Sequence, residues 1–217
     1  MYLMANKNNI NQVVWKMLQL DLAVQKDISR AIINTRALAK YLIKKYGLAQ
    51  AGLDAVISSI RRFESEETFE EEEKTLQHIF KESVISTRNN VACITLSLTI
   101  NDLVKRWANA GKLPPARITA GRRTIKIMMD QPDISLFKSM FASDEVIKIE
   151  ENLSEICVVV NEKSVLTKGV MARIANELAL ANINIHELIV CPPEFLIYVK
   201  QTDIVRAHES VFKLGLQ

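Results

Sequence analysis

The spacing of apolar residues changes along this chain, and that change constrains the fold more than any other feature of the sequence. In residues 9–63, apolar residues recur every three or four positions, as they do along one side of a helix. From about Val91 onward, short apolar or alternating runs typical of strands separate the helical stretches. We therefore predict an α+β protein with an all-helical N-terminal domain.

Local signals divide the N-terminal region into four helices. Asp21 is expected to cap the second helix, and Asn34 or Thr35 the third, because short polar side chains accept hydrogen bonds from the free amides at a helix start. Gly47 is expected to end the third helix, since glycine readily adopts the left-handed conformation found there. The fourth helix has a buried stripe with perfect helical spacing: Leu53, Val56, Ile57 and Ile60.

The third and fourth helices contain two segments, Arg36–Lys40 and Ala55–Phe63, that resemble a helix-turn-helix. Residues 1–63 as a whole resemble a winged-helix-type DNA-binding domain, with a wing expected as a hairpin around Asn89 and Asn90. Opposite its apolar stripe, the last helix has small polar residues and a cation, which suit a major groove. The DNA-contacting residues expected from this resemblance are Arg36, Lys40, Ser58, Ser59, Arg61 and Arg62. The alternative is a plain protein-interaction domain.

Charge is distributed unevenly along the chain. Residues 1–63 contain ten Lys and Arg against three Asp, which suits a polyanionic partner, although a solvated basic surface has the same composition. Residues 64–82 contain eight Glu against two Lys, and we expect them to form an acidic linker. In the alternative, this run folds against the basic block and masks it.

Two copies of one element order, β-α-β-β-α-β, follow the linker, and this is the ferredoxin-like pattern. The first module is assigned to residues 83–153 and the second to residues 154–217. The second copy lacks its last strand, and Ser83–Arg88 is expected to supply it because that segment is short and β-prone. The first copy comprises Val91–Leu98, Ile100–Ala110, Ala116–Ala120, Thr124–Asp130, Ile134–Phe141 and Glu145–Ile149. The second comprises Glu155–Val160, Gly169–Ala181, Ile183–Val190, Glu194–Lys200 and Asp203–Leu214.

The second copy contains the segments Asn161–Val170, Ala172–Ile174 and Asn182–Glu187, and these resemble an ACT domain of the kind found in the regulatory part of aspartate kinases. The first copy is ACT-like in element order only. The resemblance implies that the modules pair and hold a small ligand, such as an amino acid, near the first strand-to-helix loop. An ACT fold kept for dimerisation alone, without a ligand, is the alternative.

The ligand-binding residues that this resemblance implies lie in the loop before the helix and at the start of the next strand: Ser164, Val165, Leu166, Thr167, Gly169, Val170, Asn184 and Ile185. Gly169 would let a ligand approach the backbone, and the free amides of the helix start would favour a carboxylate. Asn184 would receive the polar end of the ligand.

No pattern in the sequence indicates catalysis, a metal site or a cofactor. His78, His186 and His208 have no metal-ligand spacing, and His186 is expected to be a structural histidine in a strand. Three scattered cysteines fit a reducing cytoplasm rather than a disulfide framework. The sequence contains no apolar run of the roughly 20 residues that span a bilayer, and Met1–Lys7 is not expected to be a secretory signal.

These features together predict a non-catalytic, cytoplasmic, amino-acid-responsive transcriptional regulator. Its partners would be DNA, an amino acid or similar small ligand, and further copies of itself, since a ferredoxin-like module exposes edge strands. The alternative is a non-catalytic ACT-type regulatory subunit that binds an amino-acid biosynthetic enzyme.

Overall fold

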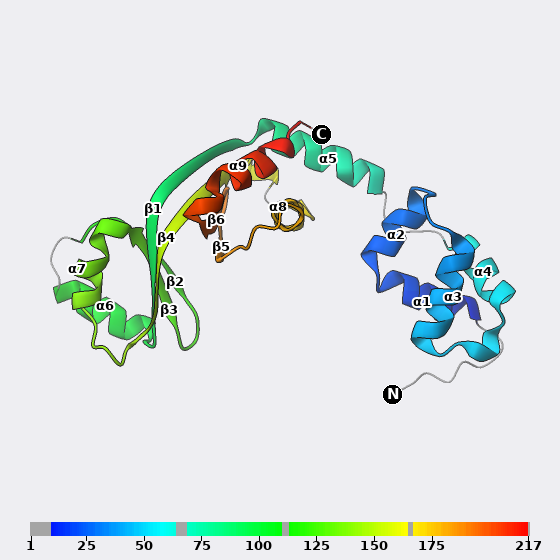
Figure 1. Cartoon of the computed structure of the whole chain (residues 1–217), viewed down its shortest axis with the longest axis horizontal. Helices are drawn as coiled ribbons and strands as arrows, with labels where there is room; N and C mark the ends of the chain where they lie inside the picture. Colours follow the sequence, from blue (N-terminus) through cyan, green and yellow to red (C-terminus); the bar gives the residue numbers. More distant parts are fainter. Residues whose placement is uncertain (1–9, 64–68, 110–112, 165–166, 217) are drawn as a thin grey trace. The chain divides into compact units, whose positions relative to one another are not determined.

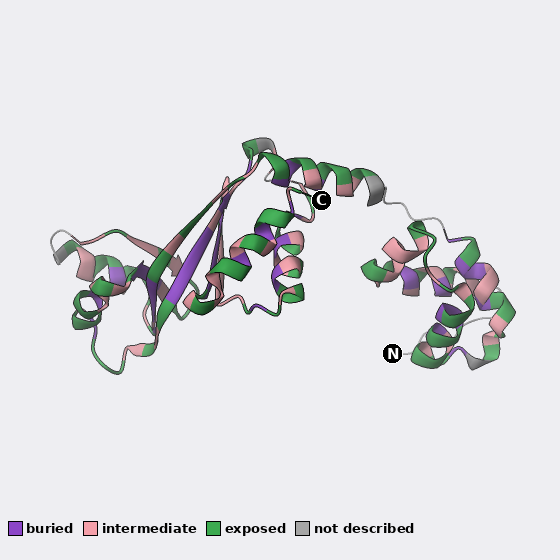
Figure 2. Cartoon of the chain, turned by 45° about the horizontal axis from the view of Figure 1, so that its top comes forward, coloured by how far each residue is buried: buried purple, intermediate pink, exposed green. Residues whose placement is uncertain are grey.

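A computed structural model describes residues 10–63, 69–109, 113–164 and 167–216 (Figure 1). The chain divides into two compact units, Met1–Glu73 and Lys74–Gln217, each with its own interior of buried residues (Figure 2). The described part of the first unit is helical, apart from turns. The second contains every described strand.

The first unit holds α1 (Ile10–Gln19), α2 (Leu22–Ser29), α3 (Thr35–Tyr46), η1 (Ala49–Ala51) and α4 (Leu53–Arg61). Its predicted caps are confirmed. The side chain of Asp21 accepts a hydrogen bond from the Val24 amide at 3.2 Å, and that of Asn34 accepts one from the Ala37 amide at 3.0 Å. Gly47 ends α3 in the left-handed conformation, with φ 69°.

The core of the helical unit comes from the predicted apolar stripes. Val56 and Ile60 of α4 are buried against α1 and α3, and Ile57 packs at the edge of the same cluster. The other buried members are Val14, Leu18, Leu38, Ala39, Leu42, Leu48 and Phe63.

The second unit is a mixed structure of helices and one antiparallel sheet. Its strands are β1 (Val84–Leu96), β2 (Ala116–Ala120), β3 (Ile125–Asp130), β4 (Val146–Val159), β5 (Glu187–Cys191) and β6 (Glu194–Lys200). Its helices are α5 (Phe69–Glu82, which begins before the division), α6 (Ile100–Asn109), η2 (Gln131–Asp133), α7 (Ile134–Ser139), η3 (Glu162–Ser164), α8 (Val170–Leu180), η4 (Gln201–Asp203) and α9 (Ile204–Lys213).

The six strands lie in the order β2-β3-β1-β4-β6-β5, and the long strands β1 and β4 run through both halves of the sheet (Figure 1). The first half-sheet contains β2, β3, the C-terminal part of β1 from Val91 to Leu96, and the N-terminal part of β4 from Val146 to Glu150. The second contains β5, β6 and the opposite ends of β1 and β4. Val84–Arg88 pairs antiparallel with Glu155–Val159, so the expectation that this segment forms a strand of the second half-sheet is confirmed.

The sequence predicted a hairpin around Asn89 and Asn90 and two separate strands in place of β4, and both predictions are wrong. Asn90 and Asn152 have φ of 55° and 56°, but each lies in a bulge of a continuous strand. Asparagine tolerates the left-handed conformation in turns and bulges alike. The register shift between Arg88 and Val91 absorbs the irregularity without reversing the chain.

Each half-sheet is covered by helices on one face. Ile94 and Ile127 of the first half pack against Leu103 of α6 and Phe137 of α7. In the second half, Ile156, Val158, Phe195 and Ile197 pack against Val170, Ile174 and Leu178 of α8 and Ala207 and Val211 of α9.

The acidic linker expected over residues 64–82 is helical from Phe69 onward. Leu76, Ile79 and Phe80 are spaced three and one residues apart, so they share one side of α5, and all three are buried in the core of the second half-sheet. The glutamates of the run do not prevent this packing, because the buried side chains follow them in the last turns of the helix.

The opposite faces of the two half-sheets pack against each other. Successive strand residues point to opposite faces, so the neighbours of the helix-facing residues form a separate cluster. This central cluster contains strand residues alone: Val91, Cys93, Met128, Leu153, Leu196 and Tyr198 are buried, and Cys157 and Ile189 lie at its edge.

Candidate ligand-binding site

The loop implicated by the sequence leads from β4 into α8. Its backbone is held by turns, in which the Ser164 amide donates to the Asn161 carbonyl at 2.8 Å and the Thr167 amide donates to the Ser164 carbonyl at 3.0 Å. Gly169 has a φ of 91°, a left-handed conformation that favours glycine, and it precedes the first residue of α8. Val165 and Leu166 lie outside the described residues.

The remaining predicted ligand residues have different environments. Val170 is 2% exposed and belongs to the core of the second half-sheet, so its side chain supports α8 instead of facing a ligand. Ile185 packs against the same core, whereas Asn184 is exposed. Cavities lined by described residues include three of about 290–330 Å³, and none of these three is lined by a predicted ligand residue.

One rim of the central cluster carries a buried ionic network. The Glu155 carboxylate, whose side chain is 5% exposed, accepts hydrogen bonds from Arg117 at 2.7 Å, Arg88 at 3.3 Å and the Tyr198 hydroxyl at 2.5 Å. Arg88 also pairs with Asp130 at 3.2 Å. Burial, followed by the hydrogen bond to Glu155, raises the pKa of Tyr198 far above its usual value. The tyrosine therefore stays protonated and donates to the carboxylate.

A second ionic network lies on the same side of the sheet. Glu150 contacts Nδ1 of His186 at 3.1 Å and Nζ of Lys148 at 2.8 Å, and Lys126 of β3 pairs with Glu187 of β5. Burial alone would raise the pKa of Glu150, but hydrogen bonds from Lys148 and His186 outweigh it and lower the pKa. Glu150 is therefore held as a carboxylate. The Nε2 atom of His186 is buried and has no hydrogen-bond partner among the described residues.

A cavity of about 290 Å³ adjoins this second network, where the bulge of β4 meets the end of β6. We call it the bulge cavity. Its polar lining includes carboxylates, a lysine and two amides, and Leu153 is its buried apolar member. The residues around it are Glu150, Glu151, Asn152, Leu153, His186, Lys200, Gln201 and Thr202. Sequence reasoning assigned His186 a structural role and missed the others.

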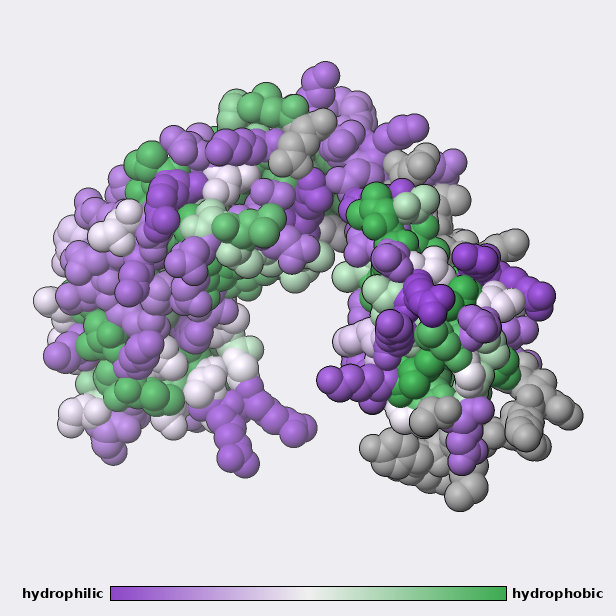
Figure 3. Space-filling model, turned by 45° about the vertical axis from the view of Figure 1, so that its right-hand side comes forward, coloured by the Kyte–Doolittle hydropathy of each residue, from purple (hydrophilic) through white to green (hydrophobic). Residues whose placement is uncertain are grey.

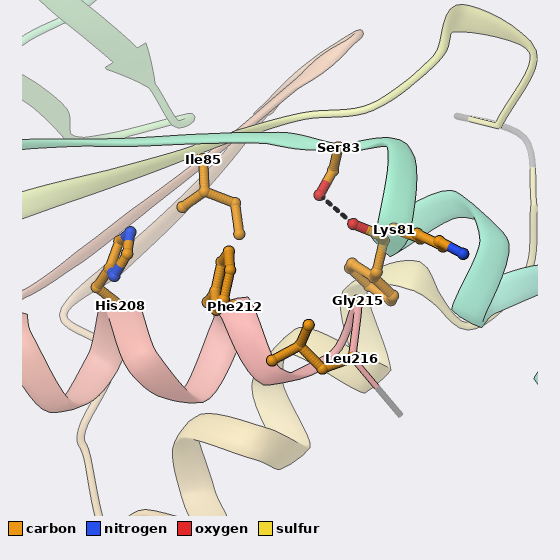
Figure 4. Close-up of a pocket in the computed structure, with 8 residues that line it drawn as sticks. Lys81, Ser83, Ile85, His208, Phe212, Gly215 and Leu216 are labelled. Atoms are coloured by element: carbon orange, nitrogen blue, oxygen red, sulfur yellow. Dashed lines mark hydrogen bonds between the residues drawn. The ribbon is translucent and has the colours of Figure 1, made fainter.

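The other two of these cavities lie between the start of β1 and α9, and both are lined by His208. Figure 4 shows the more apolar one, where Ile85 and Phe212 point toward each other from the strand and the helix. The His208 ring stacks on Phe212, with a centroid distance of 6.1 Å. Phe212 and Leu216 are 52% and 70% exposed, which indicates a surface suited to an apolar partner.

In the helical unit, four of the predicted DNA-contacting residues are exposed: Arg36, Lys40, Arg61 and Arg62. Arg36 and Lys40 lie one turn apart on α3, and the two arginines lie at the end of α4. Ser58 is half-buried. Ser59 is wrong as a contact residue because it is 0% exposed, and its hydroxyl is within hydrogen-bond distance of the Asn11 side-chain oxygen (2.6 Å) and the Ala55 carbonyl (2.9 Å).

Nothing within the described residues gathers into a group of His, Cys, Asp and Glu that could hold a metal ion. Cys93, Cys157 and Cys191 are free. Burial raises the pKa of Cys93 to about 11, so this thiol is poorly suited to nucleophilic chemistry. Within the described ranges, no helix is long and apolar enough to cross a membrane.

Comparisons with known proteins identify the fold. The regulatory subunit of aspartate kinase from Thermus flavus is similar to this chain, with a TM-score of 0.51 and 11% identity over 60% of this chain and 95% of that subunit. Aspartokinase alpha and beta subunits give a TM-score of 0.50 and 15% identity over 61% of this chain and 97% of theirs.

The aspartate kinase of Clostridium acetobutylicum gives a TM-score of 0.51 and 16% identity over 60% of this chain, which covers 34% of that enzyme. The sequence matches no family model and no curated protein. At these identities the likeness concerns the fold alone. The chain contains an ACT-like fold of the kind found in the regulatory domains of aspartate kinases.

Proposed function

We propose that this protein is an amino-acid-responsive transcriptional regulator, in which two ACT-like modules in the second unit bind a small ligand and the helical unit binds DNA. The observation that carries the ligand role is the fold likeness to aspartate kinase regulatory subunits. The β-α-β-β-α-β order of each half-sheet, the second completed by Val84–Arg88, supports two ferredoxin-like modules. The protein acts by binding, without catalysis, in the cytoplasm, where its three free cysteines would stay reduced.

DNA binding by the helical unit is supported by its exposed cations. Arg61 and Arg62 end α4, the helix that the sequence assigns to the major groove, and Arg36 and Lys40 lie on the helix packed against it. Guanidinium groups can form paired hydrogen bonds with guanine or contact phosphates. The buried Ser59 instead fixes α4 onto α1, because its carbonyl accepts the Trp15 indole hydrogen bond at 2.9 Å.

Fluorescence anisotropy with the upstream region of the protein's own gene, measured across a salt series, tests this role. Arg61→Ala and Arg62→Ala should each weaken binding by about 1–3 kcal/mol where a base contact is lost. The control is Lys16→Ala, which removes an exposed charge from α1, outside the predicted contact set. Absence of binding even near 50 mM salt, where nonspecific attraction is strong, would exclude the DNA role.

The alternative function is a regulatory subunit of an amino-acid biosynthetic enzyme, and the apolar surface of the helical unit favours it. Leu20, Leu22 and Ile32 are 80%, 58% and 69% exposed. In Figure 3, hydrophobic and hydrophilic side chains are mixed on the visible face of this unit. Such a surface suits a protein partner better than a phosphate backbone. Failure to bind DNA combined with a response to an amino acid would support this alternative.

We further propose that the protein is a homo-oligomer joined along the outer edge of Val84–Arg88. Within the described residues, no strand pairs with this edge. Val205 and Phe212, both more than half exposed, lie on either side of His208 in α9. A second copy pairing antiparallel about a twofold axis near His208 would set Val205 of each chain against Phe212 of the other. Light scattering should give a multiple of 24.6 kDa, and Phe212→Asp should reduce it.

A further inference from the structure

The bulges of β1 and β4 are two copies of one local structure. Asn90 and Asn152 share the left-handed conformation. The backbone amide of each donates to the side-chain oxygen of a glutamine that follows a strand of the opposite half-sheet. Asn90 donates to Gln201 at 3.3 Å, and Asn152 donates to Gln131 at 2.7 Å. The two half-sheets are therefore related by an approximate twofold axis through the bulges.

This relation makes Arg88 the counterpart of Glu150, since each precedes its bulge asparagine by two residues. It likewise makes Asp130 the counterpart of Lys200, since each precedes its glutamine by one. In one copy Arg88 and Asp130 meet in an ion pair of 3.2 Å. In the other copy the charges are reversed, and the two described residues at these positions, Glu150 and Lys200, form no ion pair with each other.

Between Glu150 and Lys200 lies the bulge cavity, and both residues line it. Glu150 is oriented by His186 and Lys148, while the ammonium of Lys200 has no partner among the described residues. Glu151 adds a second carboxylate to the lining, and Asn152 and Gln201 add amides. The cavity thus contains an acidic end and an unpaired cation, with a buried leucine beside them.

We propose that the bulge cavity binds a free α-amino acid, whose ammonium pairs with Glu150 and Glu151 and whose carboxylate pairs with Lys200. The inference rests on the proposed amino-acid response but places the ligand away from the Gly169 loop. In the related copy, Arg88 and Asp130 neutralise each other directly, whereas a zwitterion bound between Glu150 and Lys200 would place an opposite charge beside each of them. A volume of about 290 Å³ is at the lower limit of small-molecule sites, which suits a ligand of this size.

Titration calorimetry of the full chain with each of the twenty amino acids tests the proposal. At least one should bind, and Lys200→Met should weaken that binding at least tenfold. Lys213→Met is the matched control, because Lys213 is exposed on α9 and lines none of the three cavities. The double substitution Glu150→Arg with Lys200→Asp introduces at these two positions the residue types of the Arg88–Asp130 ion pair in the other copy, and it should abolish binding.

The results of this titration distinguish failure of the bulge-cavity site from failure of the proposed amino-acid response. Amino-acid binding that is unchanged in Lys200→Met but lost in Gly169→Asp would overturn the bulge-cavity site and leave the proposed function standing. Binding that Lys213→Met weakens as strongly as Lys200→Met would also overturn the site, because a general loss of positive charge would then account for the effect. If no amino acid binds the wild-type chain, the site and the amino-acid response both fail.

Discussion

At the scale of single residues, Glu155 connects the two half-sheets through an ion pair and a hydrogen bond. It lies on β4, and its partners Arg117 and Tyr198 come from β2 of the first half-sheet and β6 of the second. A buried carboxylate needs hydrogen-bond donors, because an unpaired charge in the interior is costly. Here two guanidinium groups and a hydroxyl supply them, and the arginines are about one-third exposed.

Glu155→Ala should lower the free energy of unfolding by about 2 kcal/mol. This is less than the 3–5 kcal/mol typical of a fully buried pair, because Arg88 and Arg117 can turn toward water. Tyr198→Phe removes only the hydroxyl contact and should cost about 1 kcal/mol. Urea denaturation followed by circular dichroism measures both changes. Equal stability of wild type and Glu155→Ala would mean that the network contributes nothing net.

The cysteines should differ in reactivity according to their burial. Burial raises the pKa of Cys93 from 9.0 to about 11, whereas Cys191 is exposed. At pH 8 a thiol reagent should modify Cys191 rapidly and Cys93 only after unfolding, which Cys191→Ser and Cys93→Ser variants can separate. Because the folded pKa is raised, the contribution of Cys93 to stability is complete below pH 9 and is lost as the pH rises through 11. Rapid modification of Cys93 in folded protein would contradict this burial.

At the scale of elements, sequence reasoning succeeded where the cause is local. The caps at Asp21 and Asn34 and the end of α3 at Gly47 depend on a few neighbouring residues. The bulges could not be predicted, because a left-handed asparagine makes a turn or a bulge according to which distant strand pairs with it. For the same reason the bulge cavity was missed. The repeated sequence Gln-x-Asp-Ile, at Gln131 and Gln201, was a signal that could have revealed it.

Helix α5 should be necessary for the second unit to fold. Its composition concealed this, because the run of glutamates masks the short apolar stripe of Leu76, Ile79 and Phe80. Gly215 lies against the end of this helix, where an added Cβ would be 2.9 Å from the Phe80 carbonyl oxygen. A fragment of residues 69–217 retains these contacts, and one of residues 83–217 loses them.

The shorter fragment should therefore be unstable. Each large buried side chain contributes about 1.5–3 kcal/mol, so losing three removes roughly 5 kcal/mol or more, close to the whole stability of many domains. Circular dichroism melts should show a cooperative transition for residues 69–217 and none, or one far lower in temperature, for residues 83–217. Equal melting temperatures would mean that α5 is only a linker, as the sequence suggested.

At the scale of the whole molecule, each of the two units has a hydrophobic core of its own. Each unit can therefore respond to its own partner, the ligand in the second and DNA in the first. A ligand that binds the folded second unit raises the stability of that unit by mass action. Regulation requires more than this, namely that ligand binding changes the free energy of DNA binding.

Coupling between ligand binding and DNA binding is reciprocal. If an amino acid changes the affinity for DNA by some factor, DNA must change the affinity for the amino acid by the same factor, because the two binding steps form a closed thermodynamic cycle. For a tenfold effect the coupling free energy is about 1.4 kcal/mol, within the usual range for allosteric proteins. Anisotropy with and without the amino acid gives one side of the cycle, and calorimetry with and without DNA gives the other. Lys200→Met should remove both effects together while leaving the affinity for DNA of the unliganded protein unchanged. An amino acid that binds tightly but leaves the DNA affinity unchanged would show that the two units are uncoupled, and the ligand signal would then have to reach a protein partner of the second unit.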